Sequence, residues 1–524
     1  MRAHPFDRYA PFTDIVALKE WSAKPLRKSV RVNTLKCSVE RFREWAKEKG
    51  WKLEQVPWCR EGFFVERSAA PHPGPLPMGE GDQPHSLSPR ERVRVRGDER
   101  EALGKDLLHL IGGFYIQEAA SMLPVGLLDP QPGEAILDMS AAPGSKATQI
   151  AARMIHPLPL EGRGQGEGCA RGVILANDIQ EHRLWTLKSS LHRSGVTNVI
   201  VTKKVGQWFG KHMTERFDRV LCDAPCTAQG TVRKDSDALN YCGQENSEKM
   251  ARLQVQLLEA AIHAAKVGGR IVYSTCTLTP EENEGVVGTI LGKCEGKVEA
   301  VDVREGRMKN QELGISLETA MEDSRCVQQF LHPAPYTLLP TLRLWPQTYD
   351  TEGFFCAVFQ KIAPTRPVEP MWTVPFQEER LSGSRQKEIA AKLEDCYGTD
   401  FLGGGDILFK SGEQLFLTNA DVASHHLPIQ DYSAGIPFAK ILNDGRVRVS
   451  HEIATLRGTR ATKGIAAIHD DRLTFFLKGK DAPCAQELRG DILLLYKDFC
   501  IGRALAKNGV LKNNLPRWML ATTR

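Results

Sequence analysis

The chain has 524 residues, 41% of them hydrophobic and 25% charged, and its net charge of +5 makes nucleic acid a compatible partner for a globular, multidomain protein. No apolar run approaches the length of a membrane span, and the N-terminal residues lack the apolar core of a signal peptide. The 13 cysteines include no C-x-x-C pair, which argues against a disulfide framework or a structural zinc site and favours a cytoplasmic setting.

Residues 1–69 are predicted to form a small α/β domain. Residues 29–35 alternate as a strand does, and Ser38 then begins a helix that Gly50 ends. Two further strand-like runs, WKLEQVPW and GFFVE, follow this helix.

A group of basic side chains lies at the start of this domain. Its members are Lys24, Arg27, Lys28 and Arg31. Such a cluster either meets RNA phosphates or forms an ordinary solvated face, and the sequence leaves both readings open.

Two stretches rich in Pro, Gly and charge interrupt the regular patterns, at residues 70–99 and 156–168. They share an H-P-x-P-L opening and a later G-E-G, so we interpret them as one inserted low-complexity sequence that is present twice. Both insertions are predicted to be disordered and to carry no function.

A loop of small residues follows the first strand of the central part of the chain. The strand is expected at 135–138, the loop at 140–145, and a helix from Lys146 onward. This arrangement presents backbone N–H groups and a helix N-terminus to a ligand. Gly144 is the single glycine of the loop, so the sequence gives little support to a dinucleotide pyrophosphate cradle.

Strands and helices alternate across residues 135–290, which predicts a doubly wound, Rossmann-like parallel sheet in an α/β domain spanning 100–363. A helix expected at 117–128 leads into this sheet. The second strand ends in Asp178, which is a candidate for binding ribose hydroxyls or, alternatively, the N-cap of the next helix.

Two later strands end in an acid and two cysteines. FDRVLCDAPC holds Asp223 and Cys226, and GGRIVYSTCT holds Cys276. Because ligands of open α/β sheets bind beyond the carboxyl ends of the strands, all three side chains are expected at one edge of the sheet. The alternative is a pair of ordinary buried cysteines; the presence of both thiols beside an acid favours chemistry.

Residues 364–524 are predicted to form a small, mostly β C-terminal domain after a Pro-rich linker. It contains a helix at 385–396 and several strand-like runs, DILFK, EQLFLT, RVRVSHEIA, RLTFFLKG and DILLLYKDFCIGRAL. Its basic side chains either bind RNA or are merely solvated, and they are Arg446, Arg448, Arg457, Arg460 and Lys463.

Six stretches of the sequence together resemble the Nop/Sun family of RNA 5-methylcytosine methyltransferases. They are RVNTLK, YIQEAASML, DMSAAPGSKATQIA, DAPCTAQGTVRKD, STCTLTPEENEGVV and WPQTYDTEGFF. The stretches are long and stand in the family's order, and the resemblance as a whole covers nearly the whole chain apart from the two insertions. The RKD tripeptide, the last stretch and the C-terminal domain resemble most a bacterial branch that modifies small-subunit ribosomal RNA.

The resemblance implies a class I methyltransferase that binds S-adenosylmethionine, a PUA-like C-terminal domain, and RNA as partner. It places Asp178 on the ribose hydroxyls and Asp223 near the methionine end. One position departs from the pattern, because Val205 stands where an acid meets the adenine. The remaining cofactor contacts implied are Ser140, Ala141, Ala142, Pro143, Gly144, Ser145 and Lys146.

The same resemblance implies separate roles for the two thiols. Carbon 5 of cytosine accepts a methyl group only after a thiolate adds to carbon 6 and turns the ring into an enamine. Cys276 is implied as that nucleophile, Cys226 as the group that assists release, and Asp223 as the residue that holds the base.

The function implied is methyl transfer to carbon 5 of a cytosine in small-subunit ribosomal RNA. A transfer RNA substrate, and a non-catalytic RNA-binding or assembly factor on the same scaffold, are the alternatives. Amino-directed methyltransferases are disfavoured because DAPC has a thiol where their D/N-P-P-Y/F motif has an aromatic residue, and oxidoreductases because the glycine triplet is missing. The target cytosine and the oligomeric state are not readable from the sequence.

Overall fold

A computed structural model describes the chain in segments. These are residues 4–67, 102–154, 172–241, 243–302, 341–368, 373 and 379–520. The two predicted insertions, at 70–99 and 156–168, lie outside the described residues. Within these segments, no helix is long and apolar enough to cross a membrane.

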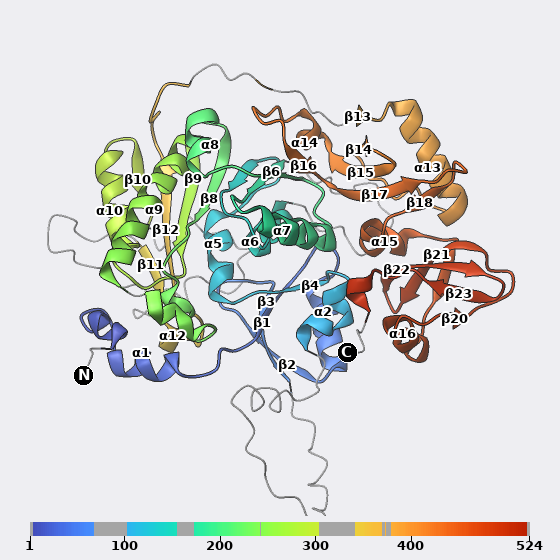
Figure 1. The fold of residues 1–524 in the computed structure, drawn as a ribbon, viewed down its shortest axis with the longest axis horizontal. Coiled ribbons are helices and arrows are strands. Elements are labelled where there is room, and N and C mark those ends of the chain that lie inside the picture. The colour runs from blue at the N-terminus through green and yellow to red at the C-terminus, as the bar shows by residue number, and fades with distance from the viewer. Residues whose placement is uncertain are drawn as a thin grey trace, which may run out of the picture.

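The N-terminal part forms a four-stranded antiparallel sheet in the order β2-β3-β1-β4 (Figure 1). Helix α2 (Val39–Glu48) covers it, and Ser38 caps this helix as predicted by accepting a hydrogen bond from the Arg41 backbone. The strands are β1 (Ser29–Val32), β2 (Trp51–Gln55), β3 (Gly62–Arg67) and β4 (Phe114–Ile116). Residues on both sides of the first insertion therefore build one sheet.

The first residues of the chain pack beneath the central part. The 3-10 helix η1 (Pro5–Tyr9) and helix α1 (Ile15–Ser22) lie beside α12 (Pro346–Tyr349) (Figure 1). The buried Tyr9 ring meets the Trp345 ring edge-on at 6.1 Å between centroids. The N-terminus is thus held against the segment that follows strand β11, namely Trp345 and helix α12.

The basic cluster of the N-terminal domain divides in the structure. Lys24, Arg27 and Lys28 keep partly or fully exposed side chains, so either reading of them stands. Arg31 is only 1% exposed, so both predicted readings of that side chain, phosphate contact and solvated face, are wrong. The reason is that β1 lies between β3 and β4 and buries all four of its residues.

The central sheet has nine strands, and β11 pairs with β12 beside the main path of the sheet, whose order is β10-β12-β9-β8-β5-β6-β7-β16. The strands β9, β8, β5, β6 and β7 run parallel, as predicted, and the remaining strands are antiparallel additions. Their bounds are β5 (Ala135–Asp138), β6 (Val173–Asn177), β7 (Val199–Thr202), β8 (Phe217–Asp223), β9 (Ala265–Thr275), β10 (Val298–Ala300), β11 (Thr341–Leu344) and β12 (Phe354–Lys361).

Alternate residues of the parallel strands enter two separate hydrophobic layers. Ile136 and Ile174 pack with α5, α6 and α7, whereas Leu137 and Leu175 pack with α8, α9 and α10. A sheet that is buried on both faces requires strands that are apolar throughout, which is the pattern that the sequence has. The helices are α5 (Leu123–Leu128), α6 (Ser145–Met154), α7 (Glu181–Ser194), α8 (Gln207–His212), α9 (Gln244–Ala264) and α10 (Glu284–Lys293).

Short helical turns connect these elements. The helix predicted at 117–128 is found only from Ala120, as a 3-10 turn that continues into α5, because the Glu118 side chain accepts a hydrogen bond from the Ser121 backbone and starts the turn there. The other turns are η2 (Leu103–Lys105), α4 (Leu107–Leu110), η4 (Gln229–Thr231) and η5 (Ser236–Tyr241).

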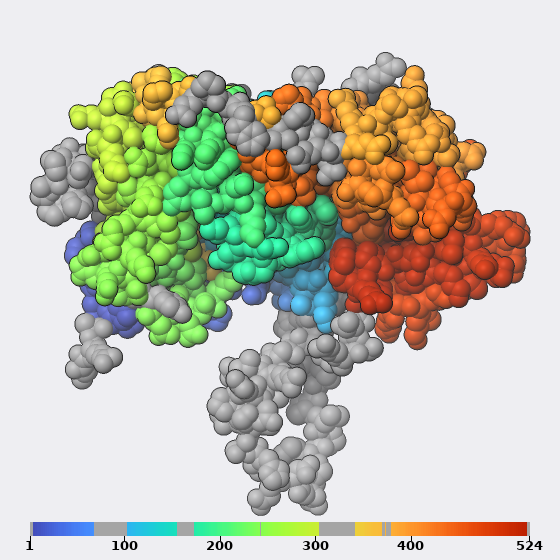
Figure 2. All heavy atoms as spheres, turned by 45° about the horizontal axis from the view of Figure 1, so that its top comes forward, coloured from blue at the N-terminus to red at the C-terminus, as the bar shows by residue number. Residues whose placement is uncertain are grey.

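The C-terminal third holds two five-stranded sheets, in the orders β13-β14-β15-β17-β18 and β19-β21-β22-β23-β20. Figure 2 shows them, in orange and red, beside the teal helices of the central part. The strands are β13 (Glu379–Arg380), β14 (Asp406–Ser411), β15 (Gln414–Asn419), β17 (Ile436–Ile441), β18 (Val447–Val449), β19 (Ile465–Ala467), β20 (Ala482–Pro483), β21 (Gly490–Tyr496), β22 (Phe499–Lys507) and β23 (Val510–Asn513). Strand β16 (Tyr432–Ala434) leaves them and pairs with the edge of the central sheet at β7.

Two of the C-terminal strand predictions are wrong. RLTFFLKG lies mostly in helix α16 (Asp470–Leu477), where two acids occupy the first turn and favour a helix N-terminus. The second half of RVRVSHEIA is helix α15 (His451–Arg457), which Ser450 caps. The remaining helices are α13 (Gly383–Tyr397), α14 (Ala420–Ser424), η7 (Gly458–Arg460) and η8 (Arg517–Met519).

The N-terminal sheet and the last C-terminal sheet share one core. Trp45 of α2 is 1% exposed, and its ring meets Tyr496 at 6.3 Å and Phe499 at 6.0 Å, both edge-on. The two regions are more than 400 residues apart in the sequence, yet their apolar residues form a single cluster.

We expect Trp45→Ala to lower the free energy of unfolding by about 3–5 kcal/mol, because it leaves a cavity at this shared contact. Urea titration followed by circular dichroism measures the loss. The control is Trp185→Ala, whose side chain is 72% exposed and which should change stability by less than about 0.5 kcal/mol. Equal effects of the two substitutions would contradict the shared core.

Candidate active site

The two predicted thiols meet at the carboxyl ends of β8 and β9. The Sγ atoms of Cys226 and Cys276 lie 3.2 Å apart, within hydrogen-bond distance. Both side chains are partly exposed, whereas the other cysteine on these two strands, Cys222, is fully buried. The structure therefore brings this pair together at the edge of the sheet, as the sequence predicted.

Asp223 is held from two sides next to the thiols. Its Oδ2 accepts a hydrogen bond from Lys146 Nζ at 2.7 Å, and its Oδ1 accepts one from Ser274 Oγ at 2.6 Å. Burial disfavours the charge of Lys146, but the Asp223 carboxylate outweighs that effect, and the pKa of Lys146 is raised. Asp223 is thus fixed between the helix that follows the small-residue loop and the strand that precedes Cys276.

The two thiols are not equivalent. The hydrogen bond between the two thiols, together with burial, raises the pKa of Cys226 well above the ordinary value of a thiol. Cys226 is therefore a protonated thiol at neutral pH, and either sulfur can be the donor of the hydrogen bond that joins it to Cys276.

A buried carboxylate fixes the loop that carries Cys226. Glu282 is fully buried and accepts hydrogen bonds from the Thr227 backbone at 3.0 Å and from Gln254 at 2.9 Å. Gln254 also donates to the Pro225 carbonyl at 2.8 Å. Sequence reasoning assigned no role to Glu282 or Gln254; the one signal was that Glu282 lies in the stretch that follows Cys276.

Two glycines allow three loops to meet behind the thiols. The Gly353 backbone donates to the Gly230 carbonyl, and the Gly230 backbone donates to the Cys276 carbonyl, both at 2.9 Å. A Cβ atom at Gly230 would lie 2.1 Å from the Gly353 carbonyl oxygen, so no larger residue fits there. Backbone hydrogen bonds through Gly230 therefore connect the WPQTYDTEGFF stretch to the Cys276 loop.

The small-residue loop 140–145 turns tightly between β5 and α6. The Ala141 backbone donates to the Asn177 carbonyl at 2.7 Å, which ties the loop to β6. Gly144 has φ +110°, and a Cβ there would lie 2.9 Å from Ser190 on α7. The loop thus approaches α7 more closely than a side chain permits.

Two buried acids flank this loop with incomplete hydrogen bonding. Asp138 and Asp178 are 1% and 2% exposed, and one carboxylate oxygen of each accepts no hydrogen bond. Burial, with Asp223 nearby, raises the pKa of Asp138 to about 7. Asp178 also accepts from the Gln180 backbone at 2.9 Å and pairs with Arg183 at 3.3 Å. The N-cap alternative for Asp178 is wrong as stated, because the residue at the N-cap of α7 is Gln180.

Val205 follows β7 at the same edge of the sheet and is 49% exposed. Asn177 joins the loops after β5 and β7, since its Nδ2 donates to the carbonyls of Met139 at 3.0 Å and Lys204 at 2.9 Å. Val205 is thereby held beside the small-residue loop as an apolar, accessible side chain.

Comparison with known proteins is consistent with this geometry. Residues 125–360 match the family described as 16S rRNA methyltransferase RsmB/F. Residues 13–78 match the N-terminal domain of 16S rRNA methyltransferase RsmF, and 465–520 match the methyltransferase RsmF PUA domain.

Ribosomal RNA small subunit methyltransferase F of Psychromonas ingrahamii is 32% identical over 95% of this chain and 92% of its own length. The protein of that name from Vibrio atlanticus is 34% identical over 94% and 91%. The chain belongs to the RsmB/F family of 16S rRNA methyltransferases. It is an enzyme that methylates ribosomal RNA with S-adenosylmethionine as methyl donor.

The fold has solved relatives as well. The crystal structure of NSun6 from Pyrococcus horikoshii with SFG superposes with a TM-score of 0.51 at 21% identity, over 69% of this chain and 98% of that one. This likeness concerns the fold alone, and it agrees with the predicted class I methyltransferase sheet. The match to the PUA domain covers the second C-terminal sheet, and the first lies outside it.

The residues around the small-residue loop fit S-adenosylmethionine. A cofactor with an amino group and ribose hydroxyls would supply hydrogen-bond donors to Asp138 Oδ2, which has none, and to Asp178 Oδ2, which has only its ion pair with Arg183. The absence of a side chain at Gly144 lets backbone N–H groups face such a ligand. Asp138 was not among the predicted contacts. Its position was a usable signal, because Asp138 ends strand β5 just as Asp178 directly follows strand β6.

The buried Arg31 connects the N-terminal sheet to the cofactor loop. Its guanidinium donates to the Ser145 carbonyl at 2.7 Å, to Thr148 Oγ1 at 2.8 Å and to Gln117 Oε1 at 2.6 Å. Burial lowers its pKa to about 10, so the group is still charged at neutral pH. One side chain from outside the central sheet thus fixes the first turn of α6.

We expect Arg31→Met to weaken S-adenosylmethionine binding about tenfold, which is the order of losing a hydrogen bond to a charged group. Calorimetric titration of the RNA-free protein measures it. The matched control is Arg457→Met, which removes a guanidinium bonded to Asp406 and the Phe401 carbonyl in the C-terminal part. The control should cost stability but not cofactor affinity; equal cofactor affinity in both variants would contradict the role of Arg31.

Proposed function

We propose that this enzyme methylates carbon 5 of a cytosine in small-subunit ribosomal RNA. The observation that supports this most is the pair of thiols 3.2 Å apart beside Asp223. A second thiol at this distance has no use in methylation of an amino group, whereas addition to carbon 6 and later release need one group for each step.

S-adenosylmethionine supplies an electrophilic methyl group when it is bound. We assign its contacts to the small-residue loop, to Asp178 for the ribose and to Asp223 for the methionine end. The loop contacts are Ser140, Ala141, Ala142, Pro143, Gly144, Ser145 and Lys146. Their support is the close approach at Gly144 and the buried Asp178 Oδ2, which accepts no hydrogen bond and has only its ion pair with Arg183.

Cys276 acts as the nucleophile. As a thiolate it would form a bond to carbon 6, and the displaced electron pair would make carbon 5 nucleophilic enough to take the methyl group, whose bond to the donor's sulfonium sulfur would break and leave its electron pair on that sulfur. Loss of the carbon 5 proton to a base then restores the double bond and expels the Cys276 thiolate. A target base has to leave its stack to reach thiols at the edge of the sheet.

Cys226 and Asp223 assist this sequence. The raised pKa of Cys226 keeps it protonated, so its S–H can stabilise the Cys276 thiolate by a hydrogen bond at the start and at the end of the reaction. Asp223 holds the amino edge of the base, and Lys146 and Ser274 keep its carboxylate oriented. Lys146 also places a positive charge near the thiols, which favours the thiolate.

We propose three working parts for the chain. Residues 1–69, whose sheet is completed by β4, form an N-terminal RNA-recognition domain, residues 100–363 the methyltransferase domain, and residues 364–524 a PUA-like RNA-binding domain. We assign no function to the insertions at 70–99 and 156–168. Ribosomal RNA as substrate supports a cytoplasmic site of action.

The target is found by bisulfite sequencing of total RNA from cells with and without the gene. A cytosine of small-subunit ribosomal RNA should lose protection when the gene is absent. Loss of protection only in transfer RNA would replace the proposed substrate, and no change at any cytosine would contradict carbon 5 chemistry.

We expect opposite outcomes for the two cysteine variants. Cys276→Ala should give no methyl transfer and no covalent complex, because nothing adds to carbon 6. Cys226→Ala should accumulate protein joined to RNA, because release is slowed. Denaturing gels of protein mixed with substrate RNA and cofactor, with and without ribonuclease, distinguish the two.

Two other outcomes would contradict these roles. If Cys276→Ala forms the covalent complex and Cys226→Ala does not, the thiols have exchanged roles. If both variants keep full activity, the thiols are core residues. Cys222→Ala is the matched control, since that cysteine is fully buried on β8 and should trap no RNA.

We expect Val205→Asp to tighten S-adenosylmethionine binding by about two- to tenfold, because it restores an acceptor for the adenine amino group. Calorimetric titration measures the change, with Val205→Ala as the control for loss of the exposed valine. Binding that is unchanged or weaker in Val205→Asp would mean that stacking or backbone contacts hold the adenine instead.

A further inference from the structure

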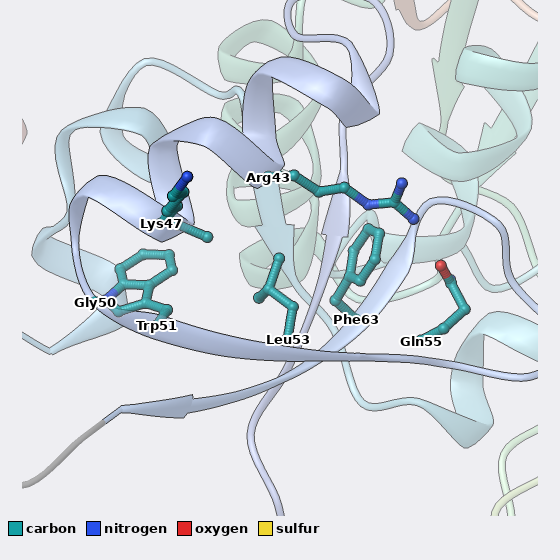
Figure 3. A pocket seen from close by; sticks show the side chains of 8 residues that line it. Arg43, Lys47, Gly50, Trp51, Leu53, Gln55 and Phe63 are labelled. Atoms are coloured by element: carbon teal, nitrogen blue, oxygen red, sulfur yellow. The ribbon is translucent and has the colours of Figure 1, made fainter.

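A cavity of about 620 Å³ lies on the N-terminal sheet, between α2 and the edge strand β2 (Figure 3). Helix α2 buries Phe42, Trp45 and Ala46 against the sheet but covers β2 only in part. Alternate residues of β2, namely Trp51, Leu53 and Gln55, therefore face the helix while half-buried. The cavity arises where the edge of the sheet extends beyond its helix.

One wall of the cavity is apolar and firmly held. The Trp51 ring meets the Phe42 and Phe114 rings at 6.5 and 6.2 Å. Phe63 forms the floor, and the Arg43 guanidinium lies 5.3 Å from its ring centroid. Figure 3 shows Arg43 extended over this ring, with Leu53 between the two aromatic side chains. A planar group entering here would find a rigid surface on which to stack.

The cations at the cavity lack acidic partners, unlike their neighbours on the same helix. Arg41 pairs with Glu44, Glu48 and Asp498, and Lys49 reaches Asp106. Arg43 and Lys47 form no ion pair with any carboxylate in the described part of the chain. Two uncompensated positive charges one helical turn apart therefore border the apolar wall.

Gln55 presents a fixed hydrogen-bond acceptor at the other end of the cavity. Its Nε2 donates to the carbonyls of Cys59 at 2.7 Å, Arg60 at 3.2 Å and Gly62 at 2.6 Å. The amide nitrogen is thus fully used, and Oε1 is turned away from these carbonyls. Figure 3 shows that oxygen beside Phe63 and below the Arg43 guanidinium.

We propose that this cavity binds an unpaired nucleotide of the RNA substrate, away from the methylated base. The base stacks on the half-buried Trp51 above the Phe63 floor, an exocyclic amino group of the base donates to Gln55 Oε1, and phosphates pair with Arg43 and Lys47. An apolar wall alone would suit many ligands; cations at its rim and an oriented acceptor at its end match a nucleotide. The proposal rests on RNA as substrate and not on which atom of the target base is methylated.

The test measures binding of a labelled single-stranded RNA oligonucleotide of mixed sequence to the full chain, without cofactor. Arg43→Gln with Lys47→Gln should raise Kd about tenfold and lower the slope of log K against log salt by about 1.5, as loss of two phosphate contacts predicts. Trp51→Leu should weaken binding without changing that slope, because stacking does not depend on salt.

The matched control is Lys52→Gln, since Lys52 lies on the same strand but points to the opposite, exposed face. It should leave Kd unchanged. Wild-type RNA affinity in the double variant, or an equal loss in Lys52→Gln, would overturn the proposal. If Trp51→Leu proves unfolded by circular dichroism, the double variant decides alone, because both of its side chains are exposed.

Methyl transfer separates this site from the active site. In the double variant, KM for small-subunit ribosomal RNA should rise about tenfold while kcat and the affinity for S-adenosylmethionine stay at wild-type values. A fall in kcat with unchanged KM would place the effect in the chemistry and overturn the proposal. Failure of carbon 5 methylation as the reaction would leave the RNA-binding result unaffected.

Discussion

The ion pair between Lys146 and Asp223 connects the two chemical halves of this molecule. Lys146 stands in the first turn of α6, directly after the loop that fits the cofactor, and Asp223 ends the strand that precedes Cys226. Ser274 completes the link by donating to the other Asp223 oxygen from β9. Because the pair is largely buried, separating its members would leave an unpaired charge in a site of low dielectric. The distance between the cofactor loop and the thiols is therefore set by one charged contact, and the rest of the central sheet supplies the strands that hold its ends.

The site depends on a second layer of buried polar groups that touch no reacting atom. Glu282 and Gln254 hold the Cys226 loop, and Arg31 holds the start of α6. Each of these side chains satisfies several backbone groups at once, which is how a buried polar residue offsets its own desolvation. Such contacts fix loops that have little apolar surface of their own. The small and polar residues around the thiols can thus be rigid without a hydrophobic core beneath them.

The sequence was sufficient for the parallel sheet and for the meeting of Asp223, Cys226 and Cys276, because apolar strands and strand ends follow local rules. The sequence was insufficient where tertiary contacts decide the burial, the secondary structure or the strand pairing of a segment. Arg31 looked like a surface cation, and its burial follows only from the position of β1 between two other strands. RLTFFLKG has the composition of a strand, but the acids that precede it at 470 and 471 and its packing against the last sheet make it a helix. The pairing of β16 with β7, across more than 200 residues, had no local signal at all.

The N-terminal sheet contacts the small-residue loop on one side and carries the cavity with unpaired cations on the other. Its strand β1 carries Arg31 into the cofactor loop, and its β4 carries Tyr115, whose hydroxyl lies 3.5 Å from the Pro143 carbonyl of the same loop. The opposite edge of that sheet, at β2, borders the cavity with uncompensated cations. Strand β3 joins β2 to β1 by backbone pairing, so the cavity and Arg31 belong to one hydrogen-bonded sheet. RNA bound at β2 and a cofactor bound beside α6 would therefore contact the same structural unit from two sides.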